Sequence, residues 1–382
     1  MSTIYYSAID SGTVSFQKSV WLNMCVEQKY ASLDNRACLD YAMGVKYFAS
    51  PKNQPELIPY GYTQMVGQTD TYQIYTSENA LPLVYIYQYA CTGSDSWTPF
   101  MHQQALLQCA VVEQPCSIPE KEPVFSDRNV SYTVNSEGTI GVSVQDGYLD
   151  VTQDGAVLQL DFEDAAACEL YVCFENLEYQ QKDPVNTTVG IRASSGSLTK
   201  TVFNATPLDN YYCGYQNYAV NLGYSEAARN SVRITFVHKG KYSCDSLRIV
   251  CQPMEQVDLY AAALRNSGVK DIACQDNGYC FTTERDSAGM ACVAIPYSKG
   301  WTAILDNEAV EILPINSGLC GIEIPAGTHT VTMKYQTPYF KLGCILNLLG
   351  IGVLVCCGLV FRRRQTSVSS DDDQDKEGTS TR

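Results

Sequence analysis

A short loop near the C-terminal end gathers aromatic, hydroxyl and ammonium side chains within five consecutive residues. These residues are Tyr297, Ser298, Lys299, Gly300 and Trp301. An aromatic ring can stack on a sugar ring, and a Lys ammonium can reach a phosphate. Alternatively, Trp301 is a core anchor and Gly300 only permits the turn, because buried aromatic side chains dominate core energetics. We therefore treat Tyr297, Ser298, Lys299 and Trp301 as candidate glycan contacts.

Carboxylates offer a second kind of chemistry. Asp161, Glu163 and Asp164 lie close together along one segment. Paired acids can carry out glycoside chemistry when both face one cleft, but spacing along a chain does not establish such a cleft. A solvated strand edge is the simpler interpretation. Since no nucleophile-elbow motif supports Ser-His-Asp chemistry either, we assign no catalytic residue.

Metal binding has weak support in the sequence. The Asp-rich stretch with Asp146, Asp150 and Asp154 could ligate calcium, although EF-hand spacing is absent. The three histidines are His102, His238 and His329. Because no CxxC pair accompanies them, a zinc site is poorly supported. We expect no cofactor and keep calcium as an unproven hypothesis.

Cysteine is abundant, with 17 residues in the chain. Cys344, Cys356 and Cys357 fall in an apolar C-terminal stretch, which leaves fourteen elsewhere. An even number outside the cell is compatible with disulfides, but their connectivity cannot be deduced from sequence. Buried free thiols are the alternative, because free Cys often behaves as a small buried hydrophobe.

The overall composition favours β-structure and disfavours nucleic acid as a partner. Hydrophobic residues make up 45% of the 382 residues and charged ones 18%, with 27 Tyr against 3 His. Tyr and β-branched residues suit a pleated, half-buried surface. The net charge is -15, and no basic run lies upstream of the C-terminus. We therefore expect no nucleic-acid binding.

Local patterns predict a mainly β fold with some α. From residue 128 to 252 the hydrophobic period is two, as in Leu158–Phe162 and Val232–Phe236, which indicates a jelly-roll-like β-sandwich. We expect a mixed α/β segment at 1–115, a linker at 116–127, the sandwich at 128–252, a helix plus a small β-module at 253–339, a transmembrane helix at 340–361 and a disordered cytoplasmic tail at 362–382.

Several elements within these segments can be predicted from capping and turn residues. The expected helices are 31–43, 99–111 and 254–265. The clearest strands are 45–48, 81–89, 292–295, 301–305, 309–313, 320–324 and 328–335, with turns at Asp306-Asn307 and Ala326-Gly327.

Leu342–Phe361 is apolar apart from Asn347 and is long enough to cross a hydrocarbon core of roughly 30 Å. Lys341 precedes it, and Arg362, Arg363 and Arg364 follow it. The positive-inside bias therefore predicts a cytoplasmic C-terminus and an extracytoplasmic bulk. The rival is a tail-anchored cytoplasmic protein with the helix inverted, against which the triple Arg argues.

The N-terminal sequence MSTIYYSAIDSG has neither a charged region nor an apolar stretch that would direct export. A single C-terminal helix would then have to translocate about 340 residues without an upstream signal. We therefore expect that Met1 is not the natural beginning and that the missing part is membrane-embedded.

Two blocks of residues carry a resemblance to a known family. Cys292–Asp306 and Gly321–Tyr335, followed by the apolar helix, closely resemble the C-terminal end of the bacterial YfhO family. Upstream, Met43–Phe48 and Glu78–Leu83 look like the same family's extracellular segment. With gaps, the resemblance runs from residue 1 to Phe361.

The resemblance implies a large multi-pass protein whose N-terminal membrane region is similar to GT-C glycosyltransferases. Such enzymes draw sugars from polyprenyl-phosphate carriers and decorate cell-surface polymers such as teichoic acids. Their catalytic carboxylates lie in loops of the membrane region, all of which this sequence lacks. The resemblance therefore implies a role in acceptor recognition or positioning, with a cell-surface glycopolymer and the lipid bilayer as partners.

Two alternatives remain open. One is a stand-alone membrane-anchored carbohydrate-binding module, which exposure of Trp97 or Trp301 would favour. The other is a structural surface protein with no small ligand, for which a broad apolar patch would take the place of a cleft.

Overall fold

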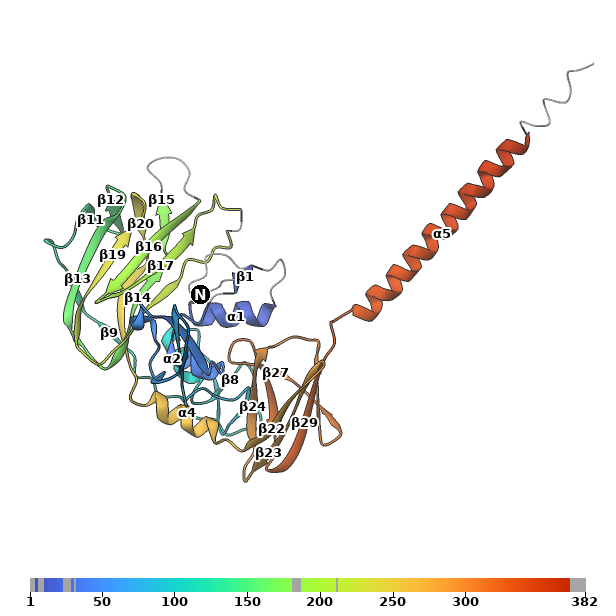
Figure 1. The fold of residues 1–382 in the computed structure, drawn as a ribbon, viewed down its shortest axis with the longest axis horizontal. Helices are drawn as coiled ribbons and strands as arrows, with labels where there is room; N and C mark the ends of the chain where they lie inside the picture. Colours follow the sequence, from blue (N-terminus) through green and yellow to red (C-terminus); the bar gives the residue numbers. More distant parts are fainter. Residues whose placement is uncertain are drawn as a thin grey trace, which may run out of the picture. The chain divides into compact units, whose positions relative to one another are not determined.

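The computed structural model describes residues 4–5, 10–22, 29–30, 32–180, 187–210 and 212–371 (Figure 1). Strands account for 46% of the chain and helices for 17%, which confirms the mainly β fold with one terminal apolar helix. Two compact units divide the chain. The N-terminal unit is Met1–Met333 and the C-terminal unit is Lys334–Arg382.

A β-sandwich forms the middle of the N-terminal unit. Its five-stranded sheet has the order β10 (Tyr132–Val134), β13 (Ala156–Ala165), β19 (Arg229–Phe236), β16 (Thr188–Ser195) and β17 (Leu198–Ala205). Its four-stranded sheet has the order β18 (Tyr218–Ser225), β14 (Cys168–Glu175), β21 (Ser246–Pro253) and β9 (Arg128–Val130). Successive strands change sheets at β13 to β14 and at β17 to β18, as in a jelly roll.

The period-two pattern explains how this sandwich closes. Leu158, Leu160, Val232 and Ile234 are buried in one hydrophobic core between the sheets. Because side chains alternate across a strand, their polar neighbours face outward. A further four-stranded sheet continues the sandwich, with the order β11 (Val142–Gln145), β12 (Tyr148–Val151), β20 (Gly240–Ser243) and β15 (Glu178–Gln180).

A six-stranded sheet joins strands from both ends of the N-terminal unit. Its order is β6 (Val84–Tyr87), β24 (Gly289–Pro296), β28 (Leu319–Ile324), β27 (Leu313–Ile315), β8 (Ala110–Val112) and β7 (Ala90–Thr92). Strands β7 and β8 run parallel, and β6 pairs antiparallel with β24. The segments expected separately at 1–115 and 253–339 therefore share one sheet.

A second sheet covers one face of the six-stranded sheet through a common hydrophobic core. Its order is β22 (Val269–Gln275), β23 (Gly278–Arg285), β29 (Gly327–Tyr335), β25 (Trp301–Leu305) and β26 (Glu308–Val310). The turn between β25 and β26 holds Asp306 and Asn307 at φ 48° and 77°, as a tight hairpin turn requires. Residues 116–127 are not a free linker, because Ile118 is buried and Lys121 N–H donates to Ala90 O at 2.9 Å.

Two predicted helices are shorter than the sequence indicates. Helix α2 spans Ala37–Ala42 only, because Asp34 and Asn35 adopt left-handed φ values of 57° and 56° that a right-handed helix cannot include. Helix α3 spans Pro99–Ala105, since the apolar residues after it form β8 beside β7. Helix α4 covers Val257–Arg265 within the predicted range.

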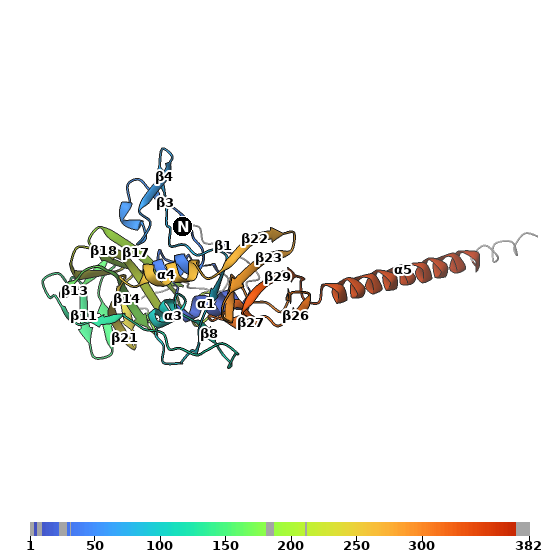
Figure 2. The same ribbon diagram turned by 90° about the horizontal axis from the view of Figure 1, so that it is seen from below.

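The remaining short elements lie near the N-terminus. They are β1 (Ile4–Tyr5), α1 (Ser11–Ser19), β2 (Lys29–Tyr30) and the 3-10 helix η1 (Pro55–Leu57). A three-stranded sheet of β3 (Tyr47–Pro51), β5 (Tyr72–Thr76) and β4 (Gln64–Gln68) stands away from the rest of the N-terminal unit in Figure 2.

Helix α5 (Phe340–Asp371) makes up most of the C-terminal unit. Its part from Phe340 to Phe361 is long and apolar enough to cross a membrane. We expected disorder from residue 362, but the helix continues to Asp371. No Gly or Pro interrupts residues 362–371, so each residue adds a backbone hydrogen bond to an existing helix. Residues 372–382 lie outside the described residues.

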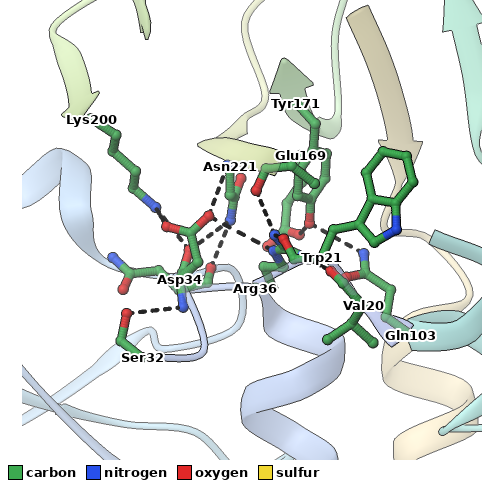
Figure 3. A network of polar contacts seen from close by, with 12 residues as sticks. Val20, Trp21, Ser32, Asp34, Arg36, Gln103, Glu169, Tyr171, Lys200 and Asn221 are labelled. Carbon is green, nitrogen blue, oxygen red and sulfur yellow. Dashed lines mark hydrogen bonds and ion pairs between the residues drawn. The ribbon is translucent and has the colours of Figure 1, made fainter. Parts of the chain in front are cut away.

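A buried polar network connects α2 to the sandwich (Figure 3). We name it the Arg36 network; its members are Asp34, Arg36, Glu169, Tyr171, Lys200 and Asn221. The fully buried Arg36 guanidinium donates to the carbonyl oxygens of Val20, Trp21 and Ala219. These three carbonyls come from the segment after α1 and from β18, so one side chain holds two distant segments together.

Two carboxylates balance the charge of Arg36. Asp34 accepts from Lys200 Nζ at 2.8 Å and from Asn221 N–H at 2.9 Å, and lies 3.7 Å from Arg36 Nε. Glu169 accepts from Ala37 N–H at 3.1 Å and from the Tyr171 hydroxyl. Burial raises the pKa of Glu169 despite these bonds.

Replacing Arg36 with Met is expected to lower the free energy of unfolding by about 3–5 kcal/mol. The change removes one of the two cations near the buried Asp34 and Glu169 carboxylates, and it takes a hydrogen-bond donor from three backbone carbonyls. Urea unfolding of the full chain in detergent micelles measures the loss. Arg192→Met, on the exposed face of β16, is the matched control and should cost no more than about 0.5 kcal/mol. Equal losses in the two variants would contradict a structural role for the network.

Asp40 on α2 is expected to make stability fall as the pH rises. It is 4% exposed, its Oδ2 has no hydrogen-bond partner among the described residues, and burial together with the Glu169 charge raises its pKa well above the usual range. The folded state therefore binds this proton more tightly than the unfolded chain. The stabilisation is full below the ordinary Asp pKa of about 3.9 and declines as the pH rises toward the folded pKa.

Asp40→Asn keeps the shape but cannot ionise. The free energy of unfolding of this variant, relative to wild type, should increase with pH. The increase should be up to about 1.4 kcal/mol per pH unit between the ordinary Asp pKa and the raised pKa of Asp40 in the folded protein. Urea unfolding at several values between about pH 4 and pH 7 measures the difference. The exposed Asp164→Asn controls for loss of one negative charge. A difference that stays constant with pH would be incompatible with this assignment.

Candidate functional site

The predicted glycan-contact loop connects β24 to β25, and its backbone is held in a tight turn. Trp301 N–H donates to Ser298 O at 3.1 Å, and Tyr297 N–H donates to Gly318 O at 2.8 Å. Gly300 is buried, whereas Lys299 is exposed. These two hydrogen bonds fix the backbone of the loop relative to the ends of the neighbouring strands.

Both aromatic side chains of this loop pack against the core between the two C-terminal sheets. Tyr297 and Trp301 are half-buried, and the Trp301 ring centroid lies 5.9 Å from that of Tyr279. Trp97 is also half-buried, against His102 and Phe125. These contacts give the aromatic residues a packing role, and glycan contact by the loop stays a prediction.

The acids Asp161, Glu163 and Asp164 lie on β13, at the edge that it shares with β10. They border a shallow hollow of about 690 Å³. Hydrogen bonds from Gln159 at 2.9 Å and Asn135 lower the pKa of Asp161, which therefore stays ionised and cannot serve as a general acid near neutral pH. This geometry suits a solvated strand edge.

A longer depression follows the line where β8 and β27 diverge. Two adjoining hollows of about 540 and 500 Å³ share Val112, Glu113 and Pro314 in their lining. We name this feature the β8–β27 groove. In the described residues, β8 and β27 are in register only at Ile315 and Val112. The first hollow continues toward Glu311 and Glu323, and the second toward Asp95 and His102.

The β8–β27 groove is strongly acidic. Its lining includes four carboxylates and, in the part of the chain that the structure describes, no Lys or Arg. The four are Asp95, Glu113, Glu311 and Glu323. Glu323 is held in place by Ser117, whose N–H donates to it at 3.1 Å. Burial lowers the pKa of His102, so its imidazole is neutral near pH 7.

This arrangement suits binding better than covalent catalysis. Carboxylates and neutral imidazole accept hydrogen bonds, so the groove presents acceptors to hydroxyl or ammonium groups. Sequence reasoning missed the groove because its walls come from residues 92–115 and 310–323, which no local pattern brings together. Each segment carries only scattered acidic residues, which gave no signal in the sequence.

Two of the residues considered for metal binding, Asp154 and His329, have protein partners. The described residues contain no group of three or more His, Cys, Asp or Glu that could hold a metal ion. Asp154 accepts from Lys239 N–H at 2.7 Å at the end of the small sheet. His329 pairs instead with Asp306 at 2.6 Å, which raises the pKa of the imidazole. Calcium binding at Asp146, Asp150 and Asp154 stays an untested hypothesis.

The charged residues that predict orientation all lie on α5. Lys341 occupies the first turn, and Arg362, Arg363 and Arg364 follow the apolar part directly. The cationic residues thus stand at both ends of the candidate span, three of the four at its C-terminal end.

Comparison with solved structures gives only loose overlaps. The arabinofuranosyltransferase AftD from mycobacteria is 12% identical over 48% of this chain and 14% of its own, with a TM-score of 0.20. Latent PorU from Porphyromonas gingivalis is 7% identical over 75% of this chain and 31% of its own, also with a TM-score of 0.20. Scores this low do not indicate a shared overall fold.

Sequence comparison is more informative. The chain is 22% identical over 350 residues to the uncharacterized protein YfhO of Bacillus subtilis (strain 168), covering 89% of this chain. It spans 38% of the length of that relative. The family described as bacterial membrane protein YfhO matches residues 3–347. Because this match takes in nearly the whole N-terminal unit and the start of α5, the chain belongs to the YfhO family of bacterial membrane proteins.

Proposed function

We propose that this chain is the extracytoplasmic portion of a glycosyltransferase-type membrane protein and that it positions the acceptor glycan. In this proposal, sugar transfer from a polyprenyl-phosphate donor takes place in a multi-pass membrane region outside the chain. Family membership supports a membrane setting. The resemblance of the family's membrane region to GT-C enzymes supports the reaction class.

The observation that carries the proposal is the β8–β27 groove. Its length, open form and row of acceptor groups suit a chain of hydroxyl-bearing units better than a small compact ligand. The described residues of its lining include carboxylates but no Lys or Arg, which disfavours phosphate groups inside it. We therefore propose that the groove takes neutral or amine-bearing sugar units of a cell-surface glycopolymer. Teichoic acids fit this role through their sugar substituents, and their phosphates would remain outside.

A membrane-anchored carbohydrate-binding module is the second candidate. It is favoured by the same groove together with α5, because the chain then needs no further region to bind glycan at a membrane. Reading the DNA immediately upstream of Met1 separates the two candidates. Several hydrophobic spans of about 20 residues there favour the glycosyltransferase. Their absence favours the module.

Glycan binding is expected to depend on the groove carboxylates. Glu113→Gln combined with Glu311→Gln should weaken binding about tenfold or more, because hydrogen bonds to charged groups are worth about 1.5–3 kcal/mol. Isothermal titration of the full chain in detergent, with neutral cell-wall polysaccharide fragments and with glycerol-phosphate teichoic acid, measures the effect. Glu163→Gln on the exposed β13 edge is the matched control. Lys299→Ala tests the predicted contact loop in the same assay.

Two results would refute the groove as the binding site. One is wild-type protein that binds neither glycan, and the other is equal loss in the groove variant and the Glu163→Gln control. Stronger binding of the glycerol-phosphate teichoic acid than of the neutral polysaccharide fragments would overturn the proposed preference for uncharged sugars.

The orientation of the chain gives a separate prediction. Cys274 on β22 is exposed, so a membrane-impermeant maleimide should label it in intact cells. A Cys introduced as Ser380→Cys in the C-terminal tail should be labelled only after the membrane is permeabilised. Peptide mapping measures the labelling of both sites, and Cys274→Ser is the control for the labelling of Cys274. Labelling of the tail but not of Cys274 in intact cells would mean that the helix is inverted.

A further inference from the structure

Two cysteine side chains meet inside the small hydrophobic cluster behind the β8–β27 groove. Cys91 lies on β7 and Cys109 follows α3, and their sulfur atoms are 2.9 Å apart. Their exposed fractions are 2% and 1%. Two sulfur atoms at this separation are closer than ordinary van der Waals packing places them. The surrounding backbone therefore already holds the two side chains close to the positions that a disulfide bond requires.

The surroundings of the pair are apolar. Ala105 and Val111 are buried beside it, and Trp97 and Phe125 pack against the same cluster. The neighbouring Cys91 thiol and burial raise the pKa of Cys109, which keeps its sulfur protonated in the folded protein. The described residues offer no further Cys, His or carboxylate that would complete a metal site here. Metal binding and a reactive thiolate are thus poor explanations for the pair.

The backbone around both cysteines is fixed independently. Strands β7 and β8 run parallel, with Cys91 in register with Val111. Cys109 N–H donates to Ala105 O at 3.0 Å, and Ala110 N–H donates to Tyr89 O at 3.0 Å. Because hydrogen bonds hold the main chain on both sides, the approach of the sulfur atoms does not depend on side-chain rotation alone.

We propose that Cys91 and Cys109 form a disulfide bond in the mature protein. The two cysteines are 18 positions apart, and the bond closes a loop that contributes Asp95 and His102 to the groove wall. It therefore fixes one wall of the β8–β27 groove covalently. The inference rests on the proposed extracytoplasmic placement, because disulfides persist in oxidising compartments and are rare in the cytoplasm.

The bond forms by exchange with an external disulfide, such as that of a thiol oxidase or of oxidised glutathione. One cysteine thiolate attacks that disulfide, forming a mixed disulfide and releasing one external thiol. The second cysteine thiolate then attacks the sulfur of the first and releases the second external thiol. Two protons and two electrons pass from the protein to the external disulfide. Since both sulfurs are buried in the folded protein, the exchange takes place while this segment is still open.

Peptide mapping tests the bond directly. Free thiols of the full chain are blocked in intact cells and again under denaturing conditions, and the digested protein is analysed by mass spectrometry without reduction. We expect a linked peptide pair that contains Cys91 and Cys109 and is lighter by two hydrogens than the reduced peptides. Cys173, buried in a separate cluster, should be recovered as a blocked free thiol. Recovery of both Cys91 and Cys109 as blocked thiols would overturn the proposal.

A second measurement distinguishes a bond from two packed thiols. Reduction of the wild-type chain, Cys91→Ser and Cys109→Ser should each lower the midpoint of thermal unfolding, and the double variant should lose no more than either single one. Additive losses in the two variants, with no effect of reduction, would instead indicate thiols that only pack. Neither measurement involves glycan, and the Cys274 labelling reports the side of the membrane separately, so failure of the disulfide and failure of the proposed function give different results.

Discussion

Arg36 places a full positive charge in the interior of the N-terminal unit, where 0% of its surface meets solvent. An uncompensated charge in such a position would be strongly destabilising, so the chain must bring acceptors and opposite charge to it. Those acceptors come from the segment after α1 and from β18, while Asp34 and Glu169 provide the balancing charge. The left-handed turn at Asp34 and Asn35, the short α2 and the docking of the sandwich all follow from meeting this one requirement.

Features governed by neighbouring residues were predictable from the sequence. The alternation in β13 and β19, the hairpin at Asp306-Asn307 and the apolar part of α5 each depend on a few consecutive positions. The six-stranded sheet was not predictable, because β6 pairs with β24 across most of the N-terminal unit and no local pattern encodes that pairing. The predicted ends of α2 and α3 were wrong because tertiary contacts, which no local pattern encodes, override helix propensity there.

The candidate site also has one part that residue types reveal and one part that only the tertiary structure creates. The aromatic loop at Tyr297 and Trp301 was recognisable by residue type, yet its rings serve the core. The β8–β27 groove could not be inferred, since its carboxylates are ordinary surface acids until the sheet brings Glu113 and Glu311 to one depression. With a net charge of -15 over the whole chain, the electrostatic field around this depression is less favourable to polyanions than to uncharged groups.

The sharing of one sheet by β6–β8 and β24–β28 also governs the order in which the chain can fold. Tyr87 and Asn316 are joined by a hydrogen bond although they are 229 positions apart. Such pairings give a high contact order, and they reward folding only after a long loop has closed. The pairing edges of β6 and β8 are therefore exposed until their later partners, β24 and β27, have been synthesised. Because α5 follows soon after, completion of this sheet and arrival of the membrane anchor are nearly simultaneous, and a chaperone that shields strand edges would act in that interval.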